Sequence, residues 1–356
     1  MKIKILFSLP LLLFFGFGCT SMNQSTQFER FFAWNLPADQ ASLQQAAALG
    51  VTDGTVVVSN LDQIRNARQC GIRPYSYLLP IESLWDEYGD GGPAPLQVMS
   101  QEENDCFNLL HHSDAGQKIR AERHHQFGGE PPREADGTFR TDVLDLPILC
   151  LGNPRTLAAV KKRIAADAQI EELGGICFDY VGFQNYHDCL CDGCTEAFNT
   201  YLQETGQQRN AVSRNAFFRQ QLVSFNNELH AYAKELRPDW ETAAHLYPVF
   251  TPDPLYGKDL LLDHVGETAA WFFPWPQEKI RQYSKQIGSY PRGVPFIGYY
   301  NATQRPEFPQ KTAETVEREL TEMSHSGAKM VMVYDFADVL ADPQVREIFA
   351  RHIKRK

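Results

Sequence analysis

Residues 174–202 read GGICFDYVGFQNYHDCLCDGCTEAFNTYL, and this stretch contains the pattern that decides the fold. Residues 175–180 form a short apolar run that ends on Asp179 and Tyr180, as a buried strand of a parallel sheet does. A loop rich in cysteine follows, and from residue 196 onward the apolar side chains recur at helical spacing. A strand, a loop and a helix in this order predict one unit of an α/β fold with parallel strands.

The same alternation of strand and helix extends over most of the chain. Strands are expected at 31–35, 55–58, 74–79, 175–180, 242–247, 268–273, 295–300 and 329–335. Helical spacing is found at 39–49, 61–70, 156–173, 196–236, 277–287, 312–326 and 343–352. Eight strands interleaved with helices predict a (β/α)₈ barrel, the TIM barrel. An open doubly wound sheet is the alternative, although FFAWNLP at 31–37 lacks the G-x-G-x-x-G of a dinucleotide site.

One long segment does not fit a minimal barrel. Residues 81–146 are polar and contain two runs rich in Gly and Pro, GDGGPAP and GGEPPREADG. The segment follows the third expected strand, where the loops of a barrel form the active-site face. We therefore expect a long loop excursion over the mouth of the barrel. We interpret its four histidines as part of a solvated polar loop and not as metal ligands: His111, His112, His124 and His125.

The beginning of the chain has the pattern of an export signal. Lys2 and Lys4 precede an apolar run at 5–17, and Cys19 follows Gly18, which is the arrangement of a bacterial lipoprotein signal. We expect removal of 1–18, a lipid on Cys19, a polar tether at 19–28 and a barrel domain at 29–356. An ordinary signal peptide is the alternative. The expected location is the membrane of a bacterial envelope, on the periplasmic side or at the cell surface.

The charge of the chain excludes one broad class of partner. Lys and Arg number 34 against 44 Asp and Glu, which gives a formal charge of −10 with neutral His. An acidic chain is not attracted to phosphate backbones, so we expect no general binding of nucleic acid. Aromatic residues make up 12% of the chain, and many of them fall near the ends of expected strands.

The most specific motif is the C-x-C-x-x-C formed by Cys189, Cys191 and Cys194. Three thiolates this close in sequence can converge on one tetrahedral ion, whereas a disulfide framework rarely crowds cysteines in this way. A structural zinc site needs a fourth ligand, and the candidates are Cys150, His187, Cys177 and Cys106. Disulfide bonds are the alternative in an exported protein.

The run CLCDGCTEAFNTYLQETG at 189–206 resembles the segment after the fourth barrel strand of family 42 beta-galactosidases and related glycoside hydrolases. In those proteins the motif carries three zinc ligands, and an upstream cysteine before an Asn-Ser-Pro or Asn-Asn-Pro type of turn supplies the fourth. The corresponding residues here are Cys150-Leu-Gly-Asn153-Pro154, so the resemblance implies that Cys150 completes the site. Four thiolates leave no open position for water, so such a zinc would hold the loop and take no part in chemistry. The last strand and helix, AKMVMVYDFADVLADPQVREIF, show the same resemblance.

The carboxyl ends of the expected strands carry aromatic, amide and carboxylate side chains, a combination that suits a sugar. Rings can stack on the apolar face of a saccharide while a few polar groups bind its hydroxyls. The predicted contacts are Trp34, Asn35, Tyr180, Gln184, Asn185, His245, Tyr247, Trp271 and Tyr300. For any one of the rings, packing beneath the loops is the alternative interpretation.

Cleavage of a glycosidic bond usually requires two carboxylates. Asp179 is the predicted general acid, because it ends an apolar strand where partial desolvation favours an uncharged carboxyl. Asp335 or Glu82 is the expected partner, and Asp253 is a weaker candidate. The family 42 enzymes have an Asn-Glu pair after strand four and a Glu nucleophile at strand seven. The corresponding runs here, FDYVGFQNY and FIGYYN, lack both, so those catalytic residues cannot be transferred.

The sequence therefore predicts a glycoside hydrolase that acts on an oligosaccharide or polysaccharide at the cell envelope and contains a structural zinc. The first alternative is a surface lipoprotein that binds glycans on the same scaffold without cleaving them. The second is another carbohydrate-active barrel, such as a lyase or an isomerase.

Overall fold

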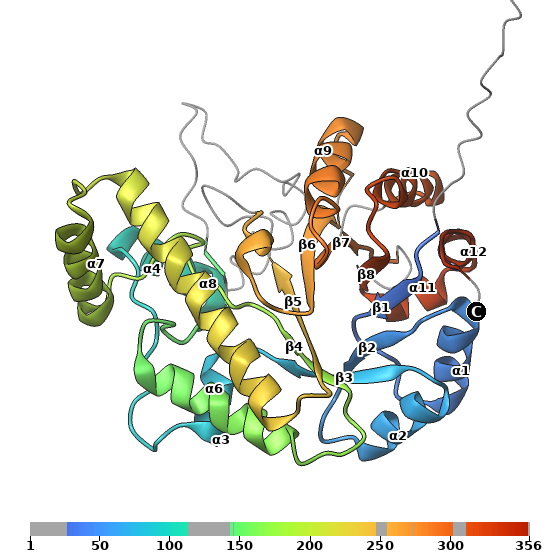
Figure 1. Ribbon diagram of the computed structural model, residues 1–356, viewed down its shortest axis with the longest axis horizontal. Coiled ribbons are helices and arrows are strands. Elements are labelled where there is room, and N and C mark those ends of the chain that lie inside the picture. The colour runs from blue at the N-terminus through green and yellow to red at the C-terminus, as the bar shows by residue number, and fades with distance from the viewer. Residues whose placement is uncertain are drawn as a thin grey trace, which may run out of the picture.

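Figure 1 shows a computed structural model of the protein, which describes residues 27–112, 143–144, 146–246, 255–272, 274–301 and 311–354. Its centre is a closed barrel of parallel strands in the order β1 to β8. The strands are β1 (Arg30–Ala33), β2 (Asp53–Val56), β3 (Arg73–Leu78), β4 (Gly175–Phe178), β5 (Glu241–Leu246), β6 (His264–Ala270), β7 (Gly293–Gly298) and β8 (Met330–Tyr334). The barrel closes where β1 pairs with β8, from Arg30 opposite Met330 to Ala33 opposite Val333. The predicted TIM barrel is confirmed, with every expected strand in place.

The helices lie around the outside of this barrel (Figure 1). They are α1 (Gln40–Leu49), α2 (Leu61–Gln69), α3 (Glu82–Tyr88), α4 (Gln101–His112), α6 (Pro154–Asp167), α7 (Asp192–Thr205), α8 (Ala211–Leu236), α9 (Gln277–Ile287), α10 (Ala313–Ser324), α11 (Phe336–Ala341) and α12 (Pro343–His352). Among the described helices, none has both the length and the hydropathy that a membrane span requires. The expected signal segment and Cys19 lie outside the described residues, as do Tyr247, Asp253, His124 and His125.

The predicted and observed helices differ in two segments. The single helix expected at 196–236 is two helices, because Gly206 ends α7 with a φ of 66° and Asn210 caps the start of α8 through the Ser213 amide. The segment expected as a long loop at 81–146 contains α3 and α4 in its described part. Its polar composition hid α3, whose Leu84 and Trp85 are buried against the rest of the chain.

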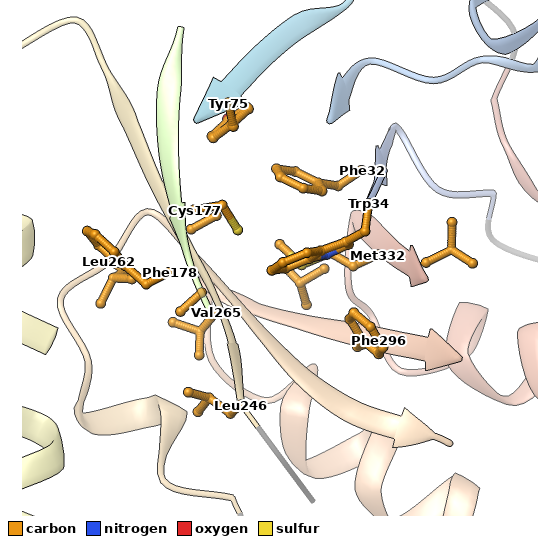
Figure 2. Close-up of a cluster of buried hydrophobic side chains, with 14 of the residues drawn as sticks. Phe32, Trp34, Tyr75, Cys177, Phe178, Leu246, Leu262, Val265, Phe296 and Met332 are labelled. Atoms are coloured by element: carbon orange, nitrogen blue, oxygen red, sulfur yellow. The ribbon is translucent and has the colours of Figure 1, made fainter. Parts of the chain in front are cut away.

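Large apolar side chains fill the barrel from within, as Figure 2 shows for Phe32, Trp34 and Phe296. The rings of Phe32 and Tyr75 lie 4.8 Å apart, and those of Trp34 and Phe296 lie 6.1 Å apart. The interior is therefore a packed core and not a channel, as in other barrels of this kind. A ligand that contacts the strands therefore binds at one of the two ends of the barrel.

A network of charges closes the end at which the strands begin. Arg30 Nη2 lies 2.5 Å from Asp53 Oδ1 and 2.8 Å from Glu241 Oε2. Tyr75 donates a hydrogen bond of 2.7 Å to Glu241, and His264 Nε2 lies 2.6 Å from the same oxygen. These side chains come from five strands, and Asp53 is only 1% exposed. A buried carboxylate of this kind depends on its cation, because an unpaired charge is costly inside a protein.

Replacement of Arg30 by Met tests this dependence. The variant leaves Asp53 and Glu241 without their shared guanidinium, so we expect the free energy of unfolding to fall by about 3 kcal/mol. Arg65→Met is the control, because Arg65 is 53% exposed and its pair with Glu172 is solvated. Urea denaturation should find the control close to the parent protein, and equal losses in the two variants would contradict the role given to Arg30.

Candidate active site and cysteine cluster

Asp179 lies at the opposite end of the barrel, directly after β4. Its amide donates to the carbonyl of Leu78, and its side chain is 8% exposed. The Tyr77 hydroxyl donates to Asp179 Oδ2 at 2.8 Å, and His245 Nδ1 lies 3.3 Å from Oδ1. Three neighbouring strands thus bring a carboxyl, a phenol and an imidazole to one point, where parallel barrels place their chemistry.

The imidazole of His245 packs closely against neighbouring side chains. Its Nε2 atom lies 3.1 Å from Thr268 Oγ1, and its ring stacks on Phe296 with centroids 3.8 Å apart. The Trp271 ring lies 5.8 Å away on the same imidazole, and Trp34 meets it edge-on at 5.7 Å. Of the predicted residues, the structure thus gathers Asp179, His245, Trp34 and Trp271. Thr268 was not predicted, although its inward position on β6 marks it as a polar group in the core.

Burial shapes the electrostatics of this cluster. Desolvation, and then the charge of Asp179, hold the pKa of Tyr77 well above its usual range. The phenol therefore stays a hydrogen-bond donor at any physiological pH. The partners of Asp179 are Tyr77 and His245, and no Lys or Arg of the described chain pairs with it.

The two proposed partner carboxylates lie elsewhere around the mouth. Asp335 follows β8, is 6% exposed, and accepts a hydrogen bond from the Ala337 amide at the start of α11. Glu82 is exposed in the first turn of α3. Neither is a hydrogen-bond partner of Asp179. The structure therefore gives the predicted acid a histidine as its close neighbour.

Several side chains predicted to bind sugar already contact other parts of the protein. Trp34 is 1% exposed, so its packing favours the alternative interpretation that the ring fills the top of the core (Figure 2). Gln184 Nε2 donates to the Leu144 carbonyl, and Asn185 Nδ2 donates to Asp188 Oδ1 at 2.9 Å. Contact of these amides with a ligand stays a prediction, and it would require those bonds to break.

The remaining predicted contacts lie at the mouth of the barrel. Asn35 is exposed with a φ of 60°, and Tyr180 has a φ of 50°. Tyr300 stacks on Phe272 with centroids 4.1 Å apart. These residues follow β1, β4 and β7, so they lie at the rim formed by the carboxyl ends of the strands.

Two hollows reach the partners of the candidate acid, one at Tyr77 and the other at His245. A cavity of about 320 Å³ is lined on one side by Asn35, Thr55, Gln63, Tyr77 and Arg163, among others. A volume of that size is at the lower end for small-ligand pockets. A second cavity of about 30 Å³ is lined by Tyr180, Tyr186, Tyr256 and His245, and it has room for a water molecule.

A larger hollow, of about 720 Å³, lies at the other end of the barrel beside Arg30, Asp53 and Arg73. Size alone would favour it as the site. We place the candidate site at the Asp179 end, because Asp53 is already paired with Arg30, and because active sites of TIM barrels lie where the strands end.

The four cysteines of the predicted metal site come together. Cys150 Sγ lies 3.8 Å from Cys189 Sγ, 3.7 Å from Cys191 Sγ and 3.5 Å from Cys194 Sγ. All four sulfurs lie within 4.8 Å of one another. A tetrahedron with zinc–sulfur bonds of about 2.3 Å has sulfur–sulfur edges of about 3.8 Å, so these distances suit a single tetrahedral ion. None of the seven cysteines in the described residues forms a disulfide bond.

The other candidate zinc ligands, Cys177, Cys106 and His187, lie outside this cluster. Cys177 is fully buried in β4 within the core (Figure 2), and Cys106 packs beside Met99 and Val143. His187 lies between two carboxylates, with Nε2 3.0 Å from Glu103 and Nδ1 3.2 Å from Asp188. Burial lowers the pKa of His187, but its bonds to Asp188 and Glu103 outweigh this and raise it to about 9.

Backbone hydrogen bonds prepare the cluster for a cation. The Val98 amide donates to Cys189 Sγ and the Cys194 amide to Cys191 Sγ, each at 3.4 Å. The thiol contact with Cys189 raises the pKa of Cys150, so the sulfurs would not all ionise without a positive charge among them. The cluster joins the turn before α6 to the start of α7, and so it holds the loop that begins at Asp179.

A pair of glycine variants tests the packing of this cluster. A Cβ atom on Gly152 would lie 2.9 Å from Cys194 Sγ, whereas one on Gly193 in the same region would meet nothing within 4 Å. We expect Gly152→Ala to lower the free energy of unfolding by about 1–3 kcal/mol and to expose the cluster thiols to a thiol reagent. Gly193→Ala should leave both unchanged or stabilise α7 slightly. Similar behaviour of the two variants would contradict the close packing around Cys194.

Comparisons with known proteins agree with the architecture. No protein-family model and no curated protein sequence matches the chain. Among solved structures, it is similar to the glycoside hydrolase domain of PgaB (BpsB) from Bordetella bronchiseptica, with a TM-score of 0.53 and 12% identity over 93% of this chain and 100% of that one. It is also similar to beta-galactosidases from the psychrophilic Marinomonas ef1 (TM-score 0.53, 9% identity, 90% of this chain) and from Rahnella sp. R3 (0.50, 11%, 93%).

The chain spans 58% and 56% of the two beta-galactosidase chains. At these identities the similarity shows a shared fold. The protein therefore has a TIM barrel of the kind found in glycoside hydrolase domains, with a buried four-cysteine cluster that could bind a metal ion.

Proposed function

We propose that this protein is a glycoside hydrolase with Asp179 as its general acid, acting on an oligosaccharide or polysaccharide at the cell envelope. The observation that carries the proposal is the buried position of Asp179 at the end of β4, held between Tyr77 and His245, with aromatic rings packed on that histidine. The proposal includes a lipid on Cys19, which would anchor the barrel to a bacterial membrane.

The surroundings of Asp179 suit a carboxyl that gives up a proton. Asp179 is buried, and its described partners are a phenol and an imidazole, with no Arg or Lys among them. Such a group can protonate the oxygen of a glycosidic bond as the carbon–oxygen bond breaks. A second carboxylate would then activate water or attack the anomeric carbon. We assign that role to Asp335 or Glu82, at the ends of β8 and β3.

The mouth of the barrel supports a saccharide as substrate. The cavity of about 320 Å³ reaches Tyr77, the partner of Asp179, and is also lined by the exposed residue Asn35. Trp271 and Tyr300 are each less than a tenth exposed, and they lie at the ends of neighbouring strands. An apolar wall with a few polar groups is the general form of a small-molecule site.

The test begins with a glycan library and the full-length protein. On a glycan that is cleaved, Asp179→Asn should lower kcat by about 10²–10⁴-fold, because the amide cannot donate the catalytic proton. Asp335→Asn and Glu82→Gln identify the partner, since only the true one should cause a loss of similar size. Asp62→Asn, on the exposed face of α2, is the control. Unchanged turnover in the Asp179→Asn variant would rule out its role as the acid.

The second part of the proposal is a structural zinc bound by Cys150, Cys189, Cys191 and Cys194. The ion would balance the charge of the thiolates and hold the β4–α7 loop in place. The tetrahedral spacing of the sulfurs supports it. A closed set of four thiolates gives the ion a structural role, so the chemistry at Asp179 belongs to the side chains.

Elemental analysis should find about one zinc per chain. Cys150→Ser should lower the zinc content and reduce the melting temperature by about 5 °C or more, as expected when a few kcal/mol of stability are lost. Cys70→Ser, outside the cluster, should keep its zinc. A protein without metal, with disulfides among the four cysteines, would contradict the site.

Two observations favour a second candidate function, the binding of glycans without cleavage. Asp335 already caps α11, and Gln184-Asn185 stand where family 42 enzymes have Asn-Glu. If a glycan binds and no variant or condition gives turnover, the barrel is a binding module.

A further inference from the structure

The contact between Asp179 and His245 requires a hydrogen on one of its two atoms. Asp179 Oδ1 and His245 Nδ1 lie 3.3 Å apart. A carboxylate oxygen and a bare imidazole nitrogen are both acceptors, so one of the two atoms has to carry hydrogen. A second hydrogen on the imidazole would have to be at Nε2, on the other side of the ring.

Thr268 constrains the other side of the ring. Its hydroxyl has one hydrogen, which it donates to the Leu246 carbonyl at 3.3 Å. Thr268 Oγ1 is then free to accept the hydrogen of His245 Nε2 at 3.1 Å. A histidine that donates through Nε2 and also shares a proton at Nδ1 contains, together with Asp179, one proton more than a carboxylate and a neutral imidazole.

The burial of Asp179 and His245 also favours one added proton on the pair. Asp179 and His245 are 6% and 7% exposed. Among the described residues, the other titratable groups that interact with Asp179 are the phenol of Tyr77 and the thiol of Cys177, and such groups are uncharged near neutral pH. The rings of Trp34, Trp271 and Phe296 pack against the imidazole of His245. A lone carboxylate here would be a buried charge without a counter-ion, whereas one added proton makes the pair neutral as a whole.

We propose that Asp179 and His245 hold one shared proton at neutral pH and work as a pair. His245 is then a positioning residue that acts through Asp179, and not a sugar contact. The catalytic part of this inference rests on the proposed function, but the shared proton does not. When Asp179 protonates the leaving oxygen, the carbon–oxygen bond breaks and the pair becomes a carboxylate and a neutral imidazole. Water then gives its hydroxyl to the anomeric carbon and its proton back to the pair.

Nuclear magnetic resonance of the full chain labelled with nitrogen-15 histidine reads the protonation of the ring directly. His245→Asn identifies the His245 signals among those of the 10 histidines. We expect Nε2 to carry hydrogen at neutral pH, with a further proton shared between Nδ1 and Asp179. A neutral ring with hydrogen on Nδ1 alone, in which Thr268 donates to Nε2, would overturn the proposal.

The pH profile on a cleaved glycan tests the catalytic part. His245→Asn keeps an amide next to Asp179 but cannot hold the shared proton. We expect kcat to fall about 10–100-fold, the alkaline limb of the profile to shift by about one pH unit or more, and KM to stay nearly constant. A uniform loss with an unchanged profile would show that His245 only supports the structure.

The two measurements separate this inference from the proposed function. Hydrogen on Nε2 in a protein that cleaves no glycan supports the shared proton and counts against the hydrolase. Cleavage by a protein whose His245 lacks that hydrogen supports the hydrolase and overturns the shared proton.

Discussion

The pairing of β1 with β8 is the constraint on which the candidate site depends. It closes eight parallel strands into one ring, so every strand ends on the same rim. Tyr77 and Asp179 are 102 positions apart in sequence, and His245 is a further 66 positions away, yet they share two hydrogen-bond contacts. No local segment could bring them together. The charge network around Arg30 supports the closure from the other end, so the site is coupled to the stability of the whole barrel.

Local patterns in the sequence predicted the features that depend on local physics. The strands could be found because residues buried on both faces are apolar in short runs, and the helices because their apolar spacing ends at glycines such as Gly50. The spacing of Cys189, Cys191 and Cys194 was enough to recognise them as candidate metal ligands. Cys150 could not, because it lies 39 positions from Cys189, and only the resemblance to known hydrolases pointed to it.

The roles of individual polar residues could not be predicted, because they depend on distant partners. Gln184 and Asn185 follow β4 and were expected to face a ligand, but a segment from the long excursion and a neighbouring carboxylate take up their amides. His245 was expected as a sugar contact, while Thr268 on the next strand occupies its outer nitrogen. The sequence indicates which face of a strand a side chain occupies, but it does not show which group stands opposite. The sequence therefore predicted which residues lie at the rim of the barrel, but not which hydrogen bonds their side chains form.

Buried carboxyl groups have different partners at the two ends of the barrel. At the end where the strands begin, burial raises the pKa of Glu241, but His264, Arg30 and Arg73 together hold it far below its usual range. Guanidinium groups do not lose their protons at any physiological pH, so that charge is permanent. Asp179, at the other end, has an imidazole and a phenol in place of guanidinium groups. The described partners of Asp179 therefore include no permanent positive charge, and this is the physical difference between the two ends of the barrel.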